Sequence, residues 1–195
     1  MIKNIIFDMG NVLLSYEPET YAEKLCRKEA AEVILRELFL GPDWAKQDLG
    51  LVGKEELYEL VKVRVPEEYH TDLRAAIYHW FDLMRPIPGA EEFLKKMKKQ
   101  GYRLYVLSNA GKEFYEYFPR HYDCALFDRL IVSCDLQIKK PDPRIYRYLL
   151  ETEGLRPEEC LFIDDMPENV SGAQALGIQG MVFRGLFEEV ERKLN

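Results

Sequence analysis

The sequence predicts a doubly wound α/β fold, in which helices cover both faces of a parallel β-sheet. Two observations carry this prediction. Four short apolar runs show no alternation, which is typical of strands buried on both faces, at residues 5–7, 104–107, 130–132 and 161–163. Segments with the apolar period of amphipathic helices lie between the later runs. Strands that alternate with helices form parallel sheets, and these sheets bind ligands at the carboxyl ends of their strands.

A polar or acidic residue follows each apolar run at once. Asp8 follows the first run, Ser108 the second, Ser133 the third and Asp164 the fourth. Residues 178–183 form a fifth candidate strand. Because the carboxyl ends of parallel strands meet at one edge of a sheet, we expect these polar side chains to lie near one another.

Three helices of the α/β pattern are predicted from periodicity and capping residues. The first spans residues 90–99. The second begins after the N-cap residue Asp142, with Pro143 in its first turn, and ends near Gly154. The third spans residues 167–177. Their buried faces should hold Ala90, Phe93, Leu94 and Met97, then Ile145, Tyr148 and Leu149, then Val170, Ala173 and Leu176.

Residues 15–85 break the alternation, because they contain no convincing strand but several apolar stripes at helical spacing. The longest stripe consists of Leu73, Ala76, Ile77, Trp80 and Met84. Residues 86–89, Pro-Ile-Pro-Gly, make a stiff linker back to the α/β pattern. We therefore predict an α/β core of residues 1–14 and 86–195, with a small helical unit of residues 15–85 inserted after the first strand.

Composition excludes several classes of function. The 195 residues carry 27 Lys and Arg against 34 Asp and Glu, a formal net charge of −7, so we expect neither a nucleic-acid nor a membrane partner. The four cysteines and three histidines show no metal-ligand spacing, which favours reduced thiols. The first apolar run is too short for a signal peptide, and none approaches the ~20 residues of a membrane span. We expect a cytoplasmic protein of undefined oligomeric state.

The polar residues at the predicted strand ends form four motifs. They are Asp8 with Gly10 behind it, Ser108-Asn109, Lys140 with the following Pro-Asp-Pro, and Asp164-Asp165 with Asn169. In order and context these motifs resemble those of the haloacid-dehalogenase-like hydrolase superfamily, in the branch that inserts a helical cap after the first motif. The resemblance covers essentially the whole chain. It implies a Rossmann-like parallel sheet with a small helical cap, in agreement with the pattern above.

The resemblance also implies a role for each motif residue. Asp8 would be the nucleophile, which takes up a phosphoryl group as an aspartyl-phosphate that water then hydrolyses. Ser108 and the backbone N–H of Asn109 would bind the phosphate at a helix N-terminus, and Lys140 would pair with both the nucleophile and the phosphate. The implied Mg²⁺ ligands are Asp8, the Gly10 carbonyl, Asp164 and Asp165, with Asn169 supporting them.

The charges of such a site require a metal ion. Three carboxylates that face a phosphate dianion repel one another at close range, so the arrangement needs a hard divalent cation and a fixed cation such as Lys140. Mg²⁺ meets this need, because it takes oxygen ligands and bridges protein to phosphate.

One position departs from the superfamily pattern. Its phosphatases usually carry a second aspartate two residues after the nucleophile, where it acts as a general acid worth ~10²–10⁴-fold in rate, but this chain has Gly10 there. The Asp-x-Gly-Asn-Val start is similar to that of the glucose-1-phosphate phosphatase-like members. An anomeric sugar phosphate would fit, since a hemiacetal oxygen leaves more easily than an alkoxide. Residues 41–50 lie between helical stretches and combine an aromatic face with polar groups, which predicts a sugar-facing loop. Within it Trp44 is a candidate sugar contact that also fits a core position.

The sequence thus predicts a Mg²⁺-dependent phosphomonoesterase that acts through an aspartyl-phosphate on a small phosphorylated metabolite, with a hexose 1-phosphate as the candidate. Two alternatives stay open. A metal-free haloacid dehalogenase would use the same nucleophile but has no need of Asp164 and Asp165. A catalytically silent phosphate- or metabolite-binding module would keep the scaffold without the reaction. Metal chelation tests the first alternative, and trapping with beryllofluoride tests the second.

Overall fold

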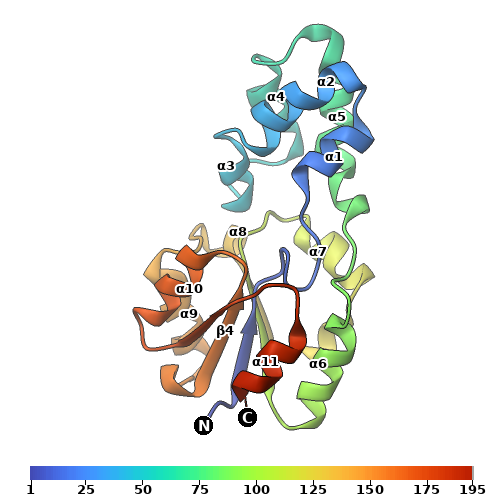
Figure 1. The fold of residues 1–195 in the computed structure, drawn as a ribbon. Coiled ribbons are helices and arrows are strands. Elements are labelled where there is room, and N and C mark those ends of the chain that lie inside the picture. Colours follow the sequence, from blue (N-terminus) through green and yellow to red (C-terminus); the bar gives the residue numbers. More distant parts are fainter. Residues whose placement is uncertain (195) are drawn as a thin grey trace.

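A five-stranded parallel sheet forms the centre of the molecule in the computed structural model, which describes residues 1–194 (Figure 1). Its strands are β1 (Asn4–Phe7), β2 (Arg103–Ser108), β3 (Arg129–Val132), β4 (Cys160–Asp164) and β5 (Gln179–Val182). They lie in the order β3-β2-β1-β4-β5, and every neighbouring pair is parallel. All five predicted strands are therefore present, and the predicted α/β class is confirmed.

Helices cover both faces of the sheet. Ile5 and Phe7 of β1 pack in a buried cluster with Phe93, whereas Ile6 packs in a separate cluster on the other face, because successive side chains of a strand point to opposite sides. Figure 1 shows the two helical layers, α6 (Ala90–Lys99) with α11 (Phe187–Leu194), and α9 (Pro143–Glu153) with α10 (Pro167–Gln174). The doubly wound arrangement that the sequence predicts is confirmed.

The register of the strands sets the position of the site. Phe7 of β1 pairs with Val106 of β2 on one side and with Ile163 of β4 on the other. The Asp8 N–H continues this ladder and donates to the Ile163 carbonyl at 2.8 Å. The residues after β1, β2 and β4 therefore leave the sheet side by side at its carboxyl edge.

The three helices predicted for the α/β pattern correspond to α6, α9 and α10. Asp142 is the N-cap of α9, since its Oδ1 accepts the Arg144 N–H at 2.9 Å. Gly154 follows the last residue of α9 in the left-handed conformation, with a φ of 61°. The third helix, α10, ends at Gln174, shortly before the predicted end at residue 177.

Two details differ from the sequence prediction. Tyr146, and not Tyr148, completes the buried face of α9, because the Tyr146 hydroxyl finds a buried partner in the Asn169 carbonyl at 2.8 Å. The final helix, α11, is missing from the prediction. Its buried residues Phe187 and Val190 form too short an apolar stripe to stand out in the sequence.

The segment between β1 and α6 folds as a group of helices above the carboxyl edge of the sheet (Figure 1). They are α1 (Pro18–Leu25), α2 (Lys28–Ile34), α3 (Trp44–Asp48), α4 (Lys54–Lys62) and α5 (His70–His79). The predicted apolar stripe is buried throughout, at Leu73, Ala76, Ile77, Trp80 and Met84.

The chain passes between the sheet and these helices at two adjacent places. The Ser15 N–H donates to the Arg85 carbonyl at 2.8 Å, and the Ile87 N–H donates to the Leu13 carbonyl at 2.8 Å. Two hydrogen-bonded connections at one edge of a helical unit can act as a hinge. We propose on this basis that residues 15–85 form a cap on a core of residues 1–14 and 86–195, the division that the sequence predicts.

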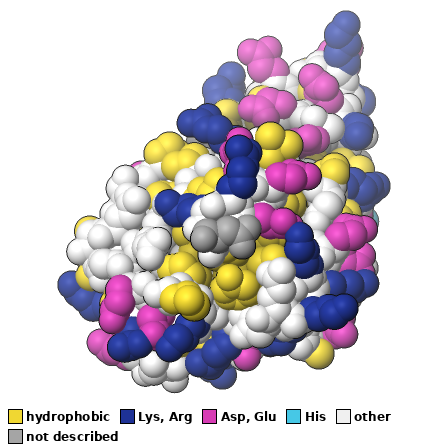
Figure 2. Space-filling model, turned by 60° about the horizontal axis from the view of Figure 1, so that its bottom comes forward, with side chains coloured by type: hydrophobic (Ala, Val, Ile, Leu, Met, Phe, Trp, Pro, Cys, Tyr) yellow, Lys and Arg dark blue, Asp and Glu magenta, His cyan; other side chains and the backbone are white. Residues whose placement is uncertain are grey.

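The surface carries charges of both signs, and the cysteines form no disulfide within the described residues. Figure 2 shows acidic and basic side chains interspersed over the end of the molecule that lies away from the cap. Within residues 1–194, the four cysteines are unpaired, and Cys134 and Cys160 are buried. None of the helices in this part of the chain combines the length and apolar character needed to cross a membrane.

Candidate active site

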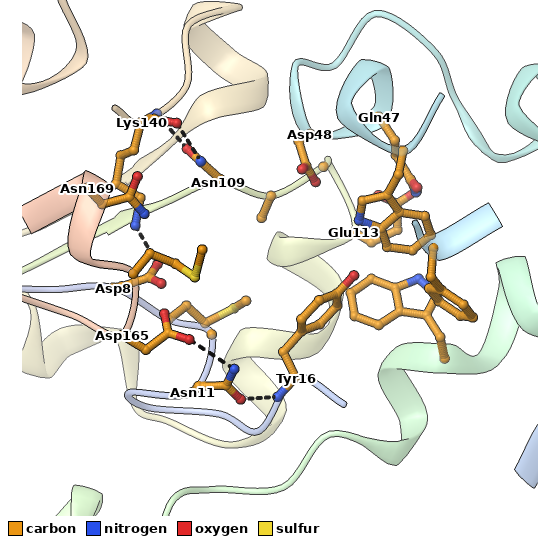
Figure 3. A pocket seen from close by; sticks show the side chains of 18 of the residues that line it. Asp8, Asn11, Tyr16, Gln47, Asp48, Asn109, Glu113, Lys140, Asp165 and Asn169 are labelled. Atoms are coloured by element: carbon orange, nitrogen blue, oxygen red, sulfur yellow. Dashed lines mark hydrogen bonds and ion pairs between the residues drawn. The ribbon is translucent and has the colours of Figure 1, made fainter. Parts of the chain in front are cut away.

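A cavity of about 360 Å³ lies between the carboxyl edge of the sheet and the cap. Figure 3 shows Asp8, Lys140 and Asp165 on its sheet side and Gln47 and Asp48 on its cap side. Of the residues singled out in the sequence, those that line the cavity are Asp8, Gly10, Trp44, Asn109, Lys140, Asp165 and Asn169. Side chains from distant parts of the chain thus converge where the predicted strand ends meet.

Asp8 sits in a tight turn directly after β1. Both the Leu13 and the Leu14 N–H groups donate to the Met9 carbonyl at 2.9 Å, which folds the chain back behind the carboxylate. The residue is 8% exposed. Burial raises the pKa of Asp8 above its usual range, while the Lys140 ammonium opposes this shift. The pair therefore brings together a desolvated carboxylate and a fixed positive charge.

Lys140 is buried between two carboxylates. Its Nζ lies 2.7 Å from Asp8 Oδ1 and 2.7 Å from Asp164 Oδ2. Burial disfavours the charged form of Lys140, but the two carboxylates outweigh it and hold the pKa above the ordinary value. Asn109 fixes the backbone of the lysine: its Oδ1 accepts the Lys140 N–H at 2.8 Å and its Nδ2 donates to the Lys140 carbonyl at 3.0 Å.

Asp164 is completely buried and fully hydrogen-bonded. Its Oδ1 accepts from the Met166 N–H at 2.8 Å and from Asn169 Nδ2 at 3.1 Å. Its Oδ2 accepts from Lys140 at 2.7 Å and from Asn169 Nδ2 at 3.1 Å. Asp164 does not line the cavity. These contacts make Asp164 the residue that orients Lys140 and Asn169.

Three carboxylates come close enough together to share a metal ion. One oxygen each from Asp8, Asp164 and Asp165 lies within 4.8 Å of the others. Asp165 lines the cavity, and its Oδ2 accepts from Asn11 Nδ2 at 3.1 Å. Three carboxylates beside the single Lys140 ammonium leave an excess of negative charge. An all-oxygen donor set with this charge fits a hard divalent cation such as Mg²⁺.

The predicted helix N-terminus at Ser108-Asn109 is wrong. The first helix after β2 is the four-residue α7 (Phe114–Tyr117), which begins well beyond Asn109. The intervening loop is held by a side chain instead, since the Ala110 N–H donates to Ser133 Oγ at 3.0 Å. Ser133 follows β3 and is completely buried. A short loop pinned by a neighbouring strand end replaces the expected helix.

Ser108 lies behind the cavity wall rather than in it. The residue is 1% exposed, and its Oγ has no hydrogen-bond partner among the described residues. A buried hydroxyl without a partner is costly, and this one lies at the end of β2.

The cap contributes an aromatic wall that the sequence only hinted at. Trp44 lines the cavity and also packs, with ring centroids 5.0 Å from Phe39 and 5.4 Å from Trp80. Tyr16 packs edge-on against Trp80 at 5.9 Å. Trp44 thus takes both the core and the cavity position considered for it. Tyr117 belongs to the aromatic residues of segment 114–118 in the core, and it lines the same cavity.

Two polar atoms of this wall have no partner within the described residues. They are Gln47 Oε1, on a side chain 3% exposed, and Trp80 Nε1, on a side chain 6% exposed. One is an acceptor and the other a donor. The sequence marks Gln47 only as one polar residue of the predicted sugar-facing segment 41–50, because its place at the cavity depends on how the cap lies over the sheet.

A parallel sheet that gathers carboxylates and a buried lysine at the carboxyl ends of its strands has the arrangement of an α/β protein with a polar site at the sheet edge. The model of the haloacid dehalogenase-like hydrolase family matches residues 2–177, and the chain belongs to this family. The superfamily that the motifs resemble is therefore confirmed.

Individual proteins are similar over nearly the full length. Sesquiterpene phosphatase astK of Aspergillus oryzae is 27% identical over 182 residues, covering 92% of this chain and 88% of that protein. Glyceraldehyde 3-phosphate phosphatase of Methanothermobacter thermautotrophicus is 27% identical over 218 residues, with 98% and 90% covered. A HAD family enzyme of Bacteroides thetaiotaomicron, solved with magnesium and inorganic phosphate, shares the fold at a TM-score of 0.72, 24% identity, and 95% and 96% coverage.

Proposed function

We propose that this hydrolase is a Mg²⁺-dependent phosphomonoesterase that acts through an aspartyl-phosphate on a small phosphorylated metabolite. The observation that carries the proposal is the contact of Asp8 with Lys140 at 2.7 Å inside a cavity that Asp165 also lines. A carboxylate, a fixed ammonium and further carboxylates are useful together when a phosphoryl group is transferred to an oxygen. The phosphatase names of two relatives support the same reaction class.

In this proposal Asp8 is the nucleophile. An Asp8 oxygen forms a bond to phosphorus while the bond from phosphorus to the leaving oxygen breaks. Water then attacks the phosphorus of the aspartyl-phosphate, which releases phosphate and restores the Asp8 carboxylate. Lys140 balances the negative charge of Asp8 and of the phosphoryl oxygens throughout.

The other residues hold the phosphate and the metal. Asp8, Asp165 and the Gly10 carbonyl would hold Mg²⁺, which when bound shields the carboxylates and polarises the phosphoryl group. Asp164 lies close enough to be a further ligand, but it would have to give up one of its present hydrogen bonds. The groups proposed to position the phosphate and support the metal ligands are the Ser108 hydroxyl, the Asn109 backbone N–H, Lys140 and Asn169.

The cap side of the cavity favours a hydroxylated leaving group. Gln47 Oε1 accepts and Trp80 Nε1 donates, and a sugar hydroxyl can satisfy either atom. Trp44 adds an aromatic face of the kind that packs on the apolar face of a sugar ring. Together with Gly10, which removes the usual acid, these features support a sugar phosphate, with a hexose 1-phosphate as the candidate substrate.

A panel of phosphomonoesters, assayed with and without Mg²⁺, tests the proposal. We expect Mg²⁺-dependent release of phosphate, with hexose 1-phosphates among the better substrates. Asp8→Asn should lose turnover by about 10⁴-fold or more while the fold is kept. Faster hydrolysis of primary alcohol phosphates than of every sugar 1-phosphate would remove the proposed substrate. Undiminished turnover by Asp8→Asn would remove the proposed mechanism.

Two other functions are separated by simple measurements. Release of halide from a 2-haloacid that survives EDTA would favour a dehalogenase, which has no use for Asp165. A silent binding module would form no adduct with beryllofluoride and Mg²⁺, whereas a reactive Asp8 should form a stable acyl-phosphate mimic. We favour the phosphatase because the carboxylates near Asp8 would repel its charge in the absence of a cation.

A further inference from the structure

The proposed reaction needs a proton at the leaving oxygen, and position 10 cannot supply it. In phosphoryl transfer the attacking and leaving oxygens lie roughly in line on opposite sides of phosphorus. A proton donor must therefore reach the leaving oxygen, which lies on the far side of phosphorus from Asp8. On the side of the cavity away from Asp8 the cap supplies much of the wall (Figure 3).

Asp48 lies on that wall. Figure 3 shows its side chain pointing into the cavity from the side opposite Asp8. Asp48 is the last residue of α3, and its backbone carbonyl accepts a hydrogen bond from Ser133 Oγ at 2.5 Å. Ser133 also holds the loop after β2 through Ala110. The same buried serine thus ties the backbone of Asp48 to the loop that borders the phosphate end of the cavity.

Within residues 1–194 the Asp48 carboxyl group forms no hydrogen bond or ion pair. The charged and titratable groups around it are Glu113 and Lys139 of the core and the hydroxyl-bearing rings of Tyr16 and Tyr117. Burial raises the pKa of Asp48 to about 6, with Lys139 opposing the shift and Glu113 adding to it. A carboxyl group in this state can both give and take a proton near neutral pH.

The competing groups in the cavity fit the role less well. Tyr16 and Tyr117 have pKa values raised far above the ordinary range by burial, so they release a proton reluctantly. Asp165 belongs to the carboxylate cluster on the Asp8 side. Glu113 comes from the core loop and lines the cavity beside Gln47 (Figure 3), so a substitution must separate it from Asp48.

We propose that Asp48 is the catalytic residue that protonates the leaving oxygen, in place of the acid absent at Gly10. This inference rests on the proposed phosphatase function. As Asp8 bonds to phosphorus, the bond to the leaving oxygen breaks, and that oxygen takes the proton of the Asp48 carboxyl. Asp48 then accepts a proton from the water that attacks the aspartyl-phosphate, and the products are an alcohol and phosphate. Ordinary alkyl phosphates thereby become substrates besides anomeric ones.

The test compares two leaving groups with Mg²⁺ present. p-Nitrophenyl phosphate has a leaving group that needs little protonation, whereas glucose 6-phosphate has an alkoxide that needs it. Asp48→Asn should lower kcat/KM for glucose 6-phosphate by about 10²-fold or more and change that for p-nitrophenyl phosphate by less than about threefold. Glu113→Gln tests the neighbouring carboxylate of the cavity, and a loss on glucose 6-phosphate confined to this variant would overturn the assignment. Glu59→Gln is the control, because Glu59 is an exposed carboxylate of the cap that does not line the cavity, and this variant should keep the wild-type ratio of the two substrates.

The proposal also predicts how kcat/KM for glucose 6-phosphate changes with pH. A donor must carry its proton, so kcat/KM of the wild type for glucose 6-phosphate should fall as the pH rises through the pKa of Asp48, about 6. Asp48→Asn should lack this fall. If kcat/KM of the variant fell with rising pH in the same way, the assignment of Asp48 would be overturned.

A second substitution can restore the acid. A Cβ at Gly10 would lie 3.7 Å from Tyr16 Cβ and 3.9 Å from Asp8 Oδ2, which are ordinary contacts, so Gly10→Asp fits the turn. Added to Asp48→Asn, it should recover glucose 6-phosphate hydrolysis by about tenfold or more. Equal slowing on both substrates, or no slowing on either, would overturn the assignment of Asp48. A wild type that hydrolyses neither of these esters nor any hexose 1-phosphate with Mg²⁺ would overturn the phosphatase function itself, and the role of Asp48 with it.

Discussion

The ammonium nitrogen of Lys140 lies 2.7 Å from an oxygen of Asp8 in an almost fully buried ion pair. Asp164 adds a second carboxylate at 2.7 Å from the same nitrogen. A buried pair adds little stability when compared with apolar packing, but removal of one partner leaves a charge without compensation. The contact therefore opposes the protonation that burial favours at Asp8, and it holds the Asp8 carboxylate in place.

Lys140→Met should both inactivate and destabilise the protein. The variant leaves Asp8 and Asp164 facing each other in a desolvated site, so we expect the free energy of unfolding to drop by about 3–5 kcal/mol. Protonation of Asp8 would remove the uncompensated charge, so the loss should shrink as the pH falls. Urea denaturation measures it. Lys95→Met, at an exposed helix position, is the control, and equal stability of the two variants would contradict the expectation.

Mg²⁺ should stabilise the folded protein against heat. An ion that binds only the folded state contributes about 2.7 kcal/mol at a concentration 100 times its Kd. Asp165→Asn removes the negative charge of a proposed metal ligand that lines the cavity, and we expect it to abolish most of the rise in Tm and the activity together. EDTA should do the same to the wild type. A rise in Tm that sodium chloride of equal ionic strength reproduces would show general screening rather than a bound metal ion.

The sequence predicts the sheet, and the edge at which the motif residues meet, because both depend on local pattern. The unalternating runs before Asp8 and Asp164 mark strands buried on both faces, and parallel pairing brings their ends together without further information. Asp48 and Gln47 could not be predicted in this way. They reach the cavity only because the cap folds over the sheet edge, and a short polar stretch beside Trp44 carries no periodic signal of that contact.

Gln47→Leu should separate substrate binding from stability. Gln47 Oε1 is a buried acceptor without a partner in the described part of the chain, so an apolar replacement removes a desolvation cost and should not lower the free energy of unfolding. The same change removes an acceptor for a sugar hydroxyl, and a hydrogen bond of about 1 kcal/mol corresponds to roughly a fivefold rise in KM for a hexose 1-phosphate. p-Nitrophenyl phosphate, which lacks hydroxyls, is the control substrate. An equal change in KM for both would assign Gln47 to packing.

Gly50→Ala tests how closely the cap must approach the core. Gly50 follows α3 with a φ of 65°, and a Cβ there would lie 2.6 Å from the carbonyl oxygen of Cys134. Gly154 offers a matched control, since its φ is 61° and nothing lies within 4 Å of its Cβ position. Both alanine variants should lose about 1–2 kcal/mol of stability from the left-handed backbone.

Only Gly50→Ala should also lose kcat/KM, because relief of the clash moves the chain beside Asp48 away from the core and loosens its contact with Ser133. Urea denaturation and steady-state assays on both variants measure the two effects separately. If Gly50→Ala matched Gly154→Ala in activity as well as in stability, close approach of the cap at this point would not be required for catalysis.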